Sequence, residues 1–562
     1  MRWNILPLPN LGQTRQLAES LNVDTLIAQL LLQRGITDFD QAKNFFRPSL
    51  SELHDPFLMT DMDIAVARIE SAIENNESIL IFGDYDVDGT TAVSLLSTYL
   101  KSYHQNVDTY IPDRYGEGYG VSFQGIDYAD DNGCSLIIAL DCGIKSISHV
   151  DYATEKGIDF IICDHHRPGD ILPKAVAVLD PKREDCSYPY DELCGCGVGF
   201  KLIQALGSRR GQTIDDLVGY LDLVATAIAA DIVPMTGENR ILARYGLEVI
   251  NSNPRPGIAA LMKSLKKSKF DISDVVFTVA PRINAAGRIR HGQHAVNLLC
   301  ETNVDIVSQY ASEIEQYNIE RKGLDKRITQ EALSQITDNS ETDRFTTVVY
   351  QEDWHKGVIG IVASRLIETY YRPTLVFTKS DTKLAASARS VRGFDVYNAL
   401  EACSEHLEQF GGHMYAAGLT LKEENFNSFK SQFEEVVSQT MPDELREAEI
   451  TIDAEVNLSE LSPKTMRILK QFEPFGPENM TPVFMAKGLQ DTGFAKVIGE
   501  TREHLRLQIR QDRSEAFGAV GFGLAPKIGL VEHKKTFDAV FCLDENEWNG
   551  KVDLQLRIKD IR

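Results

Sequence analysis

The chain contains 562 residues and carries a formal net charge of −24, with 43% hydrophobic residues. This length exceeds what one hydrophobic core supports and predicts three or four domains. No apolar run approaches the roughly 20 residues that span a bilayer, and residues 1–7 lack a signal-peptide core, so we expect a cytoplasmic protein that contacts no membrane. The nine cysteines include no Cys-x-x-Cys pair and are expected to be reduced thiols.

Taken in chain order, the hydrophobic pattern predicts a multidomain α/β protein. Helical periodicity over residues 1–50 predicts an N-terminal helical cap, and helices alternating with apolar strands predict a parallel-sheet domain over residues 51–302. A long charged helix over residues 303–340 is expected to connect it to a second α/β domain over residues 341–442. Short alternating strands over residues 443–562 predict a small β-barrel, for which an oligonucleotide-binding (OB) fold is a natural candidate.

Three apolar runs in the first third of the chain each end in acidic residues. These runs predict buried parallel strands, whose carboxyl ends are where ligands gather. Since many carboxylates at one sheet edge repel one another, divalent cations are the simplest way to hold them together. The three segments are Ser78 to Phe82 followed by Gly83-Asp84-Tyr85-Asp86-Val87-Asp88-Gly89, Leu136 to Leu140 followed by Asp141-Cys142-Gly143, and Ile158 to Cys163 followed by Asp164-His165-His166.

The first acidic segment predicts three converging carboxylates. Asp84, Asp86 and Asp88 alternate, so they would share one face of an extended strand before a helix over Thr90 to Leu100. A calcium loop that began at Asp84 would need a bidentate glutamate where Leu95 stands, which excludes that interpretation.

A further acidic residue follows an apolar helix later in the chain. Here Asp222 is expected to cap the helix and Asp231 to be a ligand. A lone aspartate at a strand end is more often a turn or cap residue, but acids after three successive strands together with two histidines favour a metal site. Mixed carboxylate and imidazole ligands suit Mn²⁺ or Mg²⁺ better than a structural zinc.

The segment from Arg255 to Arg290 is basic, with eight Lys or Arg residues against two acids. It could form a positive stripe that holds a polyanion in a groove, or a solvated face without a partner.

Further motifs show that the chain resembles the DHH phosphoesterase family, and within it the exonucleases specific for single-stranded DNA. The resemblance covers nearly the whole chain. Two departures from the family pattern, Asp180-Pro181-Lys182 and Cys194-Gly195-Cys196, are expected to touch no presumed ligand. Besides the acidic segments, the matching motifs are Ile111-Pro112-Asp113-Arg114-Tyr115-Gly116-Glu117-Gly118-Tyr119-Gly120, Ala280-Pro281-Arg282-Ile283-Asn284-Ala285-Ala286-Gly287-Arg288, Trp354-His355-Lys356-Gly357-Val358-Ile359-Gly360, Ser387-Ala388-Arg389-Ser390, Gly411-Gly412-His413, Pro474-Phe475-Gly476-Pro477 and Trp548-Asn549-Gly550.

The resemblance implies hydrolysis of single-stranded DNA from its 5′ end to mononucleotides, in DNA repair and recombination. It implies a two-metal Mn²⁺ or Mg²⁺ site, with Asp84 as a weaker ligand candidate and His166 contacting the scissile phosphate. The ligands expected on this basis are Asp86, Asp88, Asp141, His165 and Asp231.

The resemblance also implies how the substrate is held. Arg114, Ser387 and Arg389 match family positions that hold the 5′-terminal phosphate, and His413 would approach the substrate from the second domain. The strand's path would be lined by Arg282, Asn284 and Arg288, and an OB barrel would add stacking aromatics. A single-strand-binding protein and a RecQ-type helicase are possible partners, and a monomer is expected.

Two alternatives belong to other functional classes. A phosphodiesterase of the same family would act on short oligonucleotides or cyclic dinucleotides, but it needs neither the barrel nor the basic segment. A non-catalytic strand-binding scaffold would have lost ligands, whereas every expected ligand is present.

Overall fold

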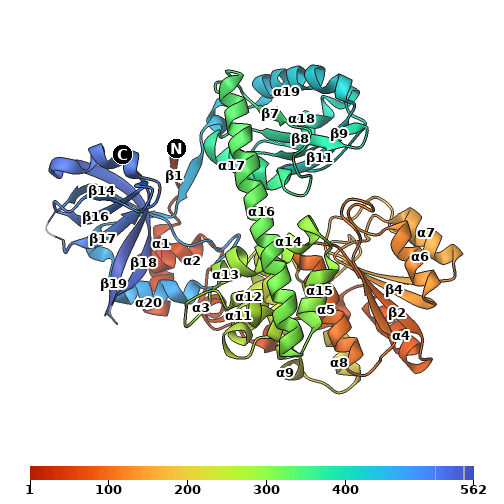
Figure 1. The fold of residues 1–562 in the computed structure, drawn as a ribbon. Coiled ribbons are helices and arrows are strands. Elements are labelled where there is room, and N and C mark those ends of the chain that lie inside the picture. Colours follow the sequence, from red (N-terminus) through yellow and green to blue (C-terminus); the bar gives the residue numbers. More distant parts are fainter. Residues whose placement is uncertain (513, 549–550) are drawn as a thin grey trace.

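The computed structural model describes residues 1–512, 514–548 and 551–562 and confirms the multidomain α/β fold (Figure 1). Asn549 and Gly550 of the motif at 548–550 lie outside the described residues. In the part of the chain that the structure describes, no helix is long and apolar enough to cross a membrane.

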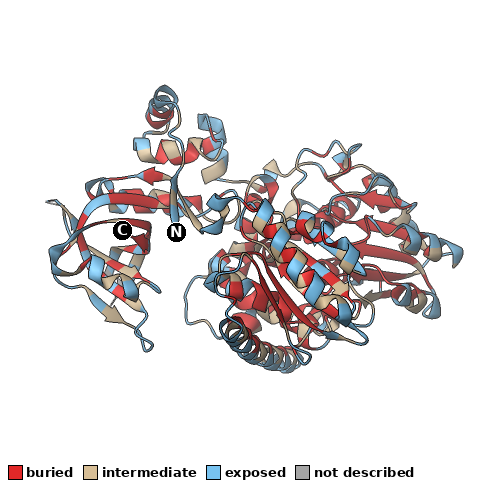
Figure 2. Ribbon diagram, turned by 90° about the horizontal axis from the view of Figure 1, so that it is seen from above, coloured by how far each residue is buried: buried red, intermediate tan, exposed pale blue. Residues whose placement is uncertain are grey.

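The first domain is built on a five-stranded parallel sheet with the order β3-β2-β4-β5-β6. Helices α4, α5 and α8 share a hydrophobic core on one face of this sheet, and α6 and α7 pack on the other. Figure 2 shows the buried strands between helices whose outer surfaces are exposed. The bounds are α4 Met62–Glu74, β2 Ser78–Gly83, α5 Val87–Lys101, β3 Val107–Tyr110, α6 Phe123–Asp131, β4 Cys134–Leu140, α7 Ile147–Glu155, β5 Asp159–Cys163, β6 Ala177–Leu179 and α8 Gly195–Arg209.

After β6 this domain is entirely helical, whereas the hydrophobic pattern predicted strands up to about residue 300. Its apolar runs pack helix against helix, so they form buried helices and add no strand to the sheet. The helices are α9 Ile214–Leu217, α10 Leu221–Ala230, α11 Gly237–Ser252, α12 Pro256–Met262, α13 Ile272–Asp274, a π-helix over Val275–Val279, α14 Ala280–Ile289 and α15 Gln293–Cys300.

A single 35-residue helix, α16 (Val304–Asp338), connects the first domain to the second. Its first half buries Val307 and Ile314 in the core of the first domain, and its second half packs Ile328 and Ile336 against the second domain. The second domain has a five-stranded sheet with the order β10-β11-β9-β8-β7. Its elements are β7 Thr347–Tyr350, α17 Ile359–Thr369, β8 Thr374–Ser380, β9 Lys383–Arg389, α18 Val396–Glu401, β10 Gln409–His413, β11 Ala416–Leu421 and α19 Phe426–Thr440.

The C-terminal strands close into a barrel, because β14 pairs with both β18 and β16. The alternation of buried and exposed residues along β16 places Leu505, Leu507 and Ile509 in the barrel core. The elements are β13 Ala454–Glu455, α20 Pro463–Leu469, β14 Phe484–Asp491, β15 Lys496–Ile498, β16 His504–Gln511, β17 Phe517–Gly521, β18 Thr536–Trp548 and β19 Lys551–Ile561.

The N-terminal region packs on the barrel. Helices α1 (Leu11–Leu21), α2 (Thr25–Leu32) and α3 (Phe39–Phe46) share the barrel's hydrophobic core and lie beside it in Figure 1. Where only helices were predicted, β1 (Arg2–Ile5) forms a strand, because it pairs in parallel with β12 (Glu449–Ile452) about 450 residues away along the chain. A local sequence pattern does not reveal such a partner.

Candidate metal centre and phosphate pocket

The acids after β2 are not arranged on one extended strand, so that prediction is wrong. The strand ends at Gly83, and Asp86 caps helix α5 by accepting a hydrogen bond from the Gly89 N–H at 3.1 Å. The helix therefore begins at Val87, three residues earlier than predicted, and Asp88 lies in its first turn. An aspartate cap that satisfies a free amide explains the early start.

The carboxylate of Asp88 is held by the N-terminus of α8. Its two oxygens accept hydrogen bonds from the Gly195 and Cys196 N–H groups at 2.6 and 2.7 Å. The expectation that Cys194-Gly195-Cys196 lies away from the ligands is therefore wrong. A Cβ at Gly195 would come within 2.6 Å of the Asp141 Cβ, so glycine is required there. A glycine at the start of a predicted helix is the sequence signal that could have indicated that helix amides bind a carboxylate here.

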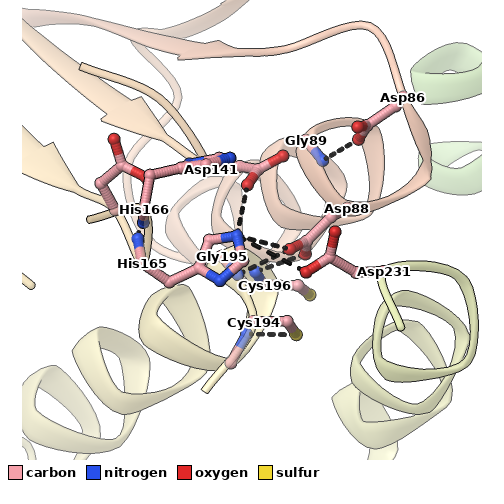
Figure 3. A network of polar contacts seen from close by, with 12 residues as sticks. Asp86, Asp88, Gly89, Asp141, His165, His166, Cys194, Gly195, Cys196 and Asp231 are labelled. Atoms are coloured by element: carbon pink, nitrogen blue, oxygen red, sulfur yellow. Dashed lines mark hydrogen bonds and ion pairs between the residues drawn. The ribbon is translucent and has the colours of Figure 1, made fainter. Parts of the chain in front are cut away.

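Asp88, Asp141, His165 and Asp231 point toward one another (Figure 3). The His165 Nε2 lies 3.2 Å from the Asp141 carboxylate, 3.5 Å from that of Asp231 and 3.7 Å from that of Asp88. The expected convergence of strand ends brings Asp141 and His165 together, and Asp231 joins them from the C-terminal end of α10.

Asp222 does not cap α10 as predicted. It lies in the first turn and its buried carboxylate forms an ion pair with Arg255, with the Arg255 Nη2 at 2.9 Å. The cap position belongs to Tyr220. The arginine comes 33 residues later in the chain, so no local pattern shows that it occupies this carboxylate.

The carboxylates of Asp88, Asp141 and Asp231 are buried close together without enough positive charge to balance them. Burial, together with the charge of Asp86, raises the pKa of Asp88 to about 7. Burial and the neighbouring carboxylates also raise the pKa values of Asp141 and Asp231 well above their ordinary range. Burial lowers the pKa of His165 to about 3, so its imidazole is neutral and free to bind a cation through a ring nitrogen. The Asp141 Oδ1 is buried without a hydrogen bond.

The donor atoms fit divalent cations. Two sets each place one atom per residue within 4.8 Å of the others, namely Asp88 with His165 and Asp231, and Asp141 with His165 and His166. Carboxylate oxygens with imidazole nitrogens suit Mn²⁺ and, with fewer nitrogen ligands, Mg²⁺. The predicted ligands Asp84 and Asp86 lie outside both sets.

Asp84 and Asp86 lie beside the group of Asp88, Asp141, His165 and Asp231 but are not part of it. Asp84 is fully buried and accepts a hydrogen bond from Gly120 N–H at 3.5 Å, while burial and the charge of Asp86 raise its pKa well above the usual range. Figure 3 shows the Asp86 carboxylate at the edge of the group, turned toward Gly89.

His166 is oriented by Asp164, for which no role was predicted. The His166 Nδ1 lies 2.7 Å from the Asp164 Oδ1, and its Nε2 lies 3.3 Å from the Tyr119 hydroxyl. Burial alone would lower the pKa of His166, but the hydrogen bond and charge of Asp164 outweigh it and raise the pKa to about 9. Asp164 therefore fixes the ring with Nε2 beside the Tyr119 hydroxyl.

Arginines gather where the two α/β domains meet. Arg114 stacks on Tyr85, with its guanidinium carbon 3.7 Å from the ring centre, and Arg288 donates to the Gly357 carbonyl at 3.0 Å. Burial, together with the nearby charges of Arg114, Arg389 and Arg321, lowers the pKa of Arg288 to about 10. Arg321 comes from α16 and was not predicted to be part of this pocket.

Ser387 and Arg389 face the start of α17. A Cβ at Gly360 would lie 3.0 Å from the Arg389 Nη2 and 3.1 Å from the Ser387 hydroxyl, so glycine lets the helix approach them closely. His413, by contrast, is exposed on the edge strand β10.

The basic segment does not form a continuous free stripe. Arg255 pairs with Asp222, Lys267 with Asp274 at 2.7 Å, and Arg282 with Glu315 at 2.5 Å. Asn284 has a buried side-chain oxygen without a hydrogen bond. These ion pairs neutralise three of the eight basic residues that the sequence places in this segment.

Comparison with known families and structures agrees with this architecture. The model of the DHH family, N-terminal domain, matches residues 78–228, the DHHA1 domain model matches residues 343–439, and the RecJ OB domain model matches residues 452–560.

Individual relatives match along the whole chain. The single-stranded-DNA-specific exonuclease RecJ of Bacillus subtilis is 36% identical over 570 residues, covering 100% of this chain and 70% of the relative. The RecJ of Escherichia coli is 32% identical, covering 95% of each chain. The crystal structure of RecJ in complex with Mn²⁺ from Thermus thermophilus superposes with a TM-score of 0.86 at 27% identity, covering 100% of this chain and 79% of that one. The chain therefore belongs to the RecJ family of DHH-domain proteins.

Proposed function

We propose that the protein is a metal-dependent exonuclease that degrades single-stranded DNA from its 5′ end to mononucleotides, in DNA repair and recombination. The observation that carries this proposal is the buried group of Asp88, Asp141, His165 and Asp231, in which burial and mutual repulsion raise the pKa values of all three carboxyl groups. It is supported by the relatives, which are named as exonucleases specific for single-stranded DNA.

The metal ligands in this proposal are Asp86, Asp88, Asp141, His165 and Asp231, with Asp84 as the weakest candidate. Mn²⁺ or Mg²⁺ is the cofactor, as in the family's crystal structures with each ion. Two divalent cations held by these residues would activate a water and stabilise the attacking and leaving oxygens of a phosphoryl displacement. The protein's own contribution is to fix the ligands, as the α8 amides do for Asp88.

His166 acts on the substrate in this proposal. Asp164 binds its Nδ1, which leaves Nε2 available to donate a hydrogen bond to a nonbridging oxygen of the scissile phosphate. This group would balance charge that develops on the phosphate during cleavage. Tyr119, which lies next to the same nitrogen, would limit how the ring can turn.

The arginine pocket holds the 5′-terminal phosphate. Arg114, Arg288 and Arg389 provide guanidinium groups, Ser387 provides a hydroxyl, and α17 begins directly beside Ser387 and Arg389. A pocket for a terminal phosphate at a fixed place relative to the metal centre explains release of one nucleotide at a time.

The strand would continue past α14 toward the barrel. Arg282 and Asn284 remain proposed contacts on this path, and His413 a contact from β10. The barrel carries a groove of about 1050 Å³ whose lining includes the exposed Phe494, three basic residues and three acidic ones, namely Arg467, Lys496, Arg506, Glu515, Glu545 and Asp553. Cationic groups that contact the phosphates of a DNA strand, and an aromatic ring on which its bases stack, suit sequence-independent binding of single-stranded DNA.

The proposal also covers oligomeric state, localisation, domain organisation and partner proteins. The protein works as a monomer in the cytoplasm, which suits its nine free cysteines. Its five domains span residues 1–50, 51–302, 303–340, 341–442 and 443–562. A single-strand-binding protein and a RecQ-type helicase would supply the unwound strand.

A substrate panel tests the proposal. Single-stranded DNA, duplex DNA, RNA and a cyclic dinucleotide are incubated with the protein and Mn²⁺, with the linear substrates labelled at either end. We expect single-stranded DNA to be degraded from its 5′ end, and His165→Ala to abolish this while strand binding persists. Preference for the cyclic dinucleotide would indicate the phosphodiesterase alternative, and full activity of His165→Ala would refute the site.

A further inference from the structure

The loop that carries Asp231 adopts a conformation that needs support. It runs from the end of α10 to the start of α11, and Ile232 directly follows Asp231 with a φ of +61°. A β-branched residue rarely adopts this left-handed conformation, and the Ile232 side chain is 77% exposed, so it gains no packing there. Contacts elsewhere along the loop must hold it in place.

Part of the support comes from the first domain itself. The Tyr190 hydroxyl donates to the Thr236 carbonyl at 2.9 Å, and the Asn239 amide donates to the Pro234 carbonyl at 3.0 Å. Met235 is buried in the core of this domain.

The rest comes from the OB domain, through a loop over residues 471–479 that precedes β14. The Met235 N–H donates to the Pro477 carbonyl at 2.8 Å, and a Cβ at Gly476 would lie only 3.0 Å from that of Met235. Asn479 fixes this loop, since its side-chain amide donates to the carbonyls of Phe472 and Pro474 at 2.8 and 2.9 Å. The backbone of the OB domain therefore lies directly against the loop that carries Asp231.

Arg240 joins the two loops. It lies in α11, four residues after Thr236, whose carbonyl accepts from its N–H, and it is only 4% exposed. Its guanidinium stacks on Phe45 with 3.9 Å between the guanidinium carbon and the ring centre. Five backbone carbonyls from two segments accept its hydrogen bonds, those of Phe45, Gln471, Phe472, Glu473 and Pro474.

We propose that Arg240 and the 471–479 loop are positioning elements for Asp231, so that docking of the OB domain completes the metal centre in addition to any contact with DNA. The inference rests on the proposed function, in which Asp231 is a metal ligand. Groups that orient a ligand commonly contribute to metal affinity although they never touch the metal.

Mn²⁺ affinity measured by calorimetry on the full-length protein without DNA tests this inference, since strand binding cannot affect it. We expect Arg240→Met to weaken Mn²⁺ binding about tenfold, as loss of an orienting group does. Arg240→Lys keeps some hydrogen-bond donors, so its Mn²⁺ affinity should lie between those of the wild type and Arg240→Met. The matched control is Arg244→Met, which removes an exposed arginine one turn further along α11 that pairs with Glu248 at 3.1 Å, and it should leave Mn²⁺ affinity unchanged.

Asp231→Asn serves as the reference that separates two kinds of failure. If Asp231→Asn weakens Mn²⁺ binding and a folded Arg240→Met does not, the positioning role is refuted while the proposed ligand stands. If Asp231→Asn itself binds Mn²⁺ like the wild type, the proposed ligand is wrong and the inference falls with it. If circular dichroism shows that Arg240→Met does not fold, Gly476→Ala replaces it, because its methyl group would press on Met235. Weaker Mn²⁺ binding by a folded Gly476→Ala would support the positioning role, and unchanged binding would refute it.

Discussion

The metal centre and the arginine pocket are two buried charge clusters of opposite sign. At the edge of the parallel sheet, burial and mutual repulsion raise the pKa values of Asp88, Asp141 and Asp231. At the domain boundary, burial and neighbouring guanidinium groups lower the pKa of Arg288. Like charges gathered in this way are unfavourable without a ligand, which supports the proposals of divalent cations at the first cluster and a phosphate at the second.

The comparison also shows how differently the two clusters are built. The side chains of the metal centre all come from one domain, where strand ends, the N-termini of α5 and α8 and the C-terminal end of α10 fix them, and the OB domain supports only the loop that carries Asp231. The arginine pocket takes Arg114 and Arg288 from the first domain, Arg321 from α16 and Arg389 from the second domain. Its geometry therefore depends on how the two domains pack together.

The largest expected effect follows from neutralising the metal centre. We predict that Asp141→Asn lowers kcat by at least about 10³-fold, as removal of a central catalytic group commonly does. Asparagine tolerates the left-handed backbone at this position, where φ is +60°. A steady-state assay with Mn²⁺ measures the loss, and the exposed Asp170→Asn is the control.

The same substitution should stabilise the metal-free protein, because it removes one of the mutually repelling buried carboxylates. Because the folded-state pKa of Asp141 is raised, its carboxylate costs stability as the pH rises through that pKa. At pH 8 in EDTA we expect Asp141→Asn to raise the free energy of unfolding by about 1–2 kcal/mol, measured by urea denaturation. A lower stability than the wild type would contradict the account of mutual repulsion.

A smaller effect is expected from the arginine pocket. We predict that Arg389→Ala raises KM for 5′-phosphorylated single-stranded DNA by about 10- to 100-fold, the value of one or two charged hydrogen bonds, with little change for a 5′-hydroxyl strand. Kinetics on the two substrates measure this difference. Arg392→Ala, an exposed arginine three residues away, is the matched control, and an equal loss on both substrates would place Arg389 outside a terminal-phosphate site.

The smallest effect is expected at Arg282, which has a counter-ion, whereas Arg114, Arg288 and Arg389 have none among the described residues. Since Glu315 already pairs with it, Arg282→Ala should change KM by less than about threefold, as for other partly exposed ion pairs. Glu315→Gln would free the guanidinium and should tighten strand binding in a fluorescence titration. A large loss for Arg282→Ala would show that DNA displaces Glu315.

The sequence predicts the fold well where the signal is local. Apolar runs that end in Asp141 and Asp164 identify strands β4 and β5, and the long charged pattern identifies α16. Parallel strands end at a common edge, so the meeting of Asp141 and His165 follows from the pattern alone.

What the sequence does not show depends on partners far along the chain. Asp88 lies on a helix because Asp86 caps it, and its carboxylate is bound by amides more than 100 residues later. Asp222 and Arg282 are neutralised by residues 33 positions away in both cases. Such pairings set which charges remain free, and only the folded structure reveals them.

The central claim is that the crowded carboxylates form a two-metal centre. Calorimetric titration with Mn²⁺ tests this most directly, by counting the ions bound per chain in the wild type and in Asp141→Asn. The account predicts two Mn²⁺ ions for the wild type, as in two-metal nucleases, and a loss of at least one in the variant. Equal binding by the two proteins, or no binding by the wild type, would contradict it.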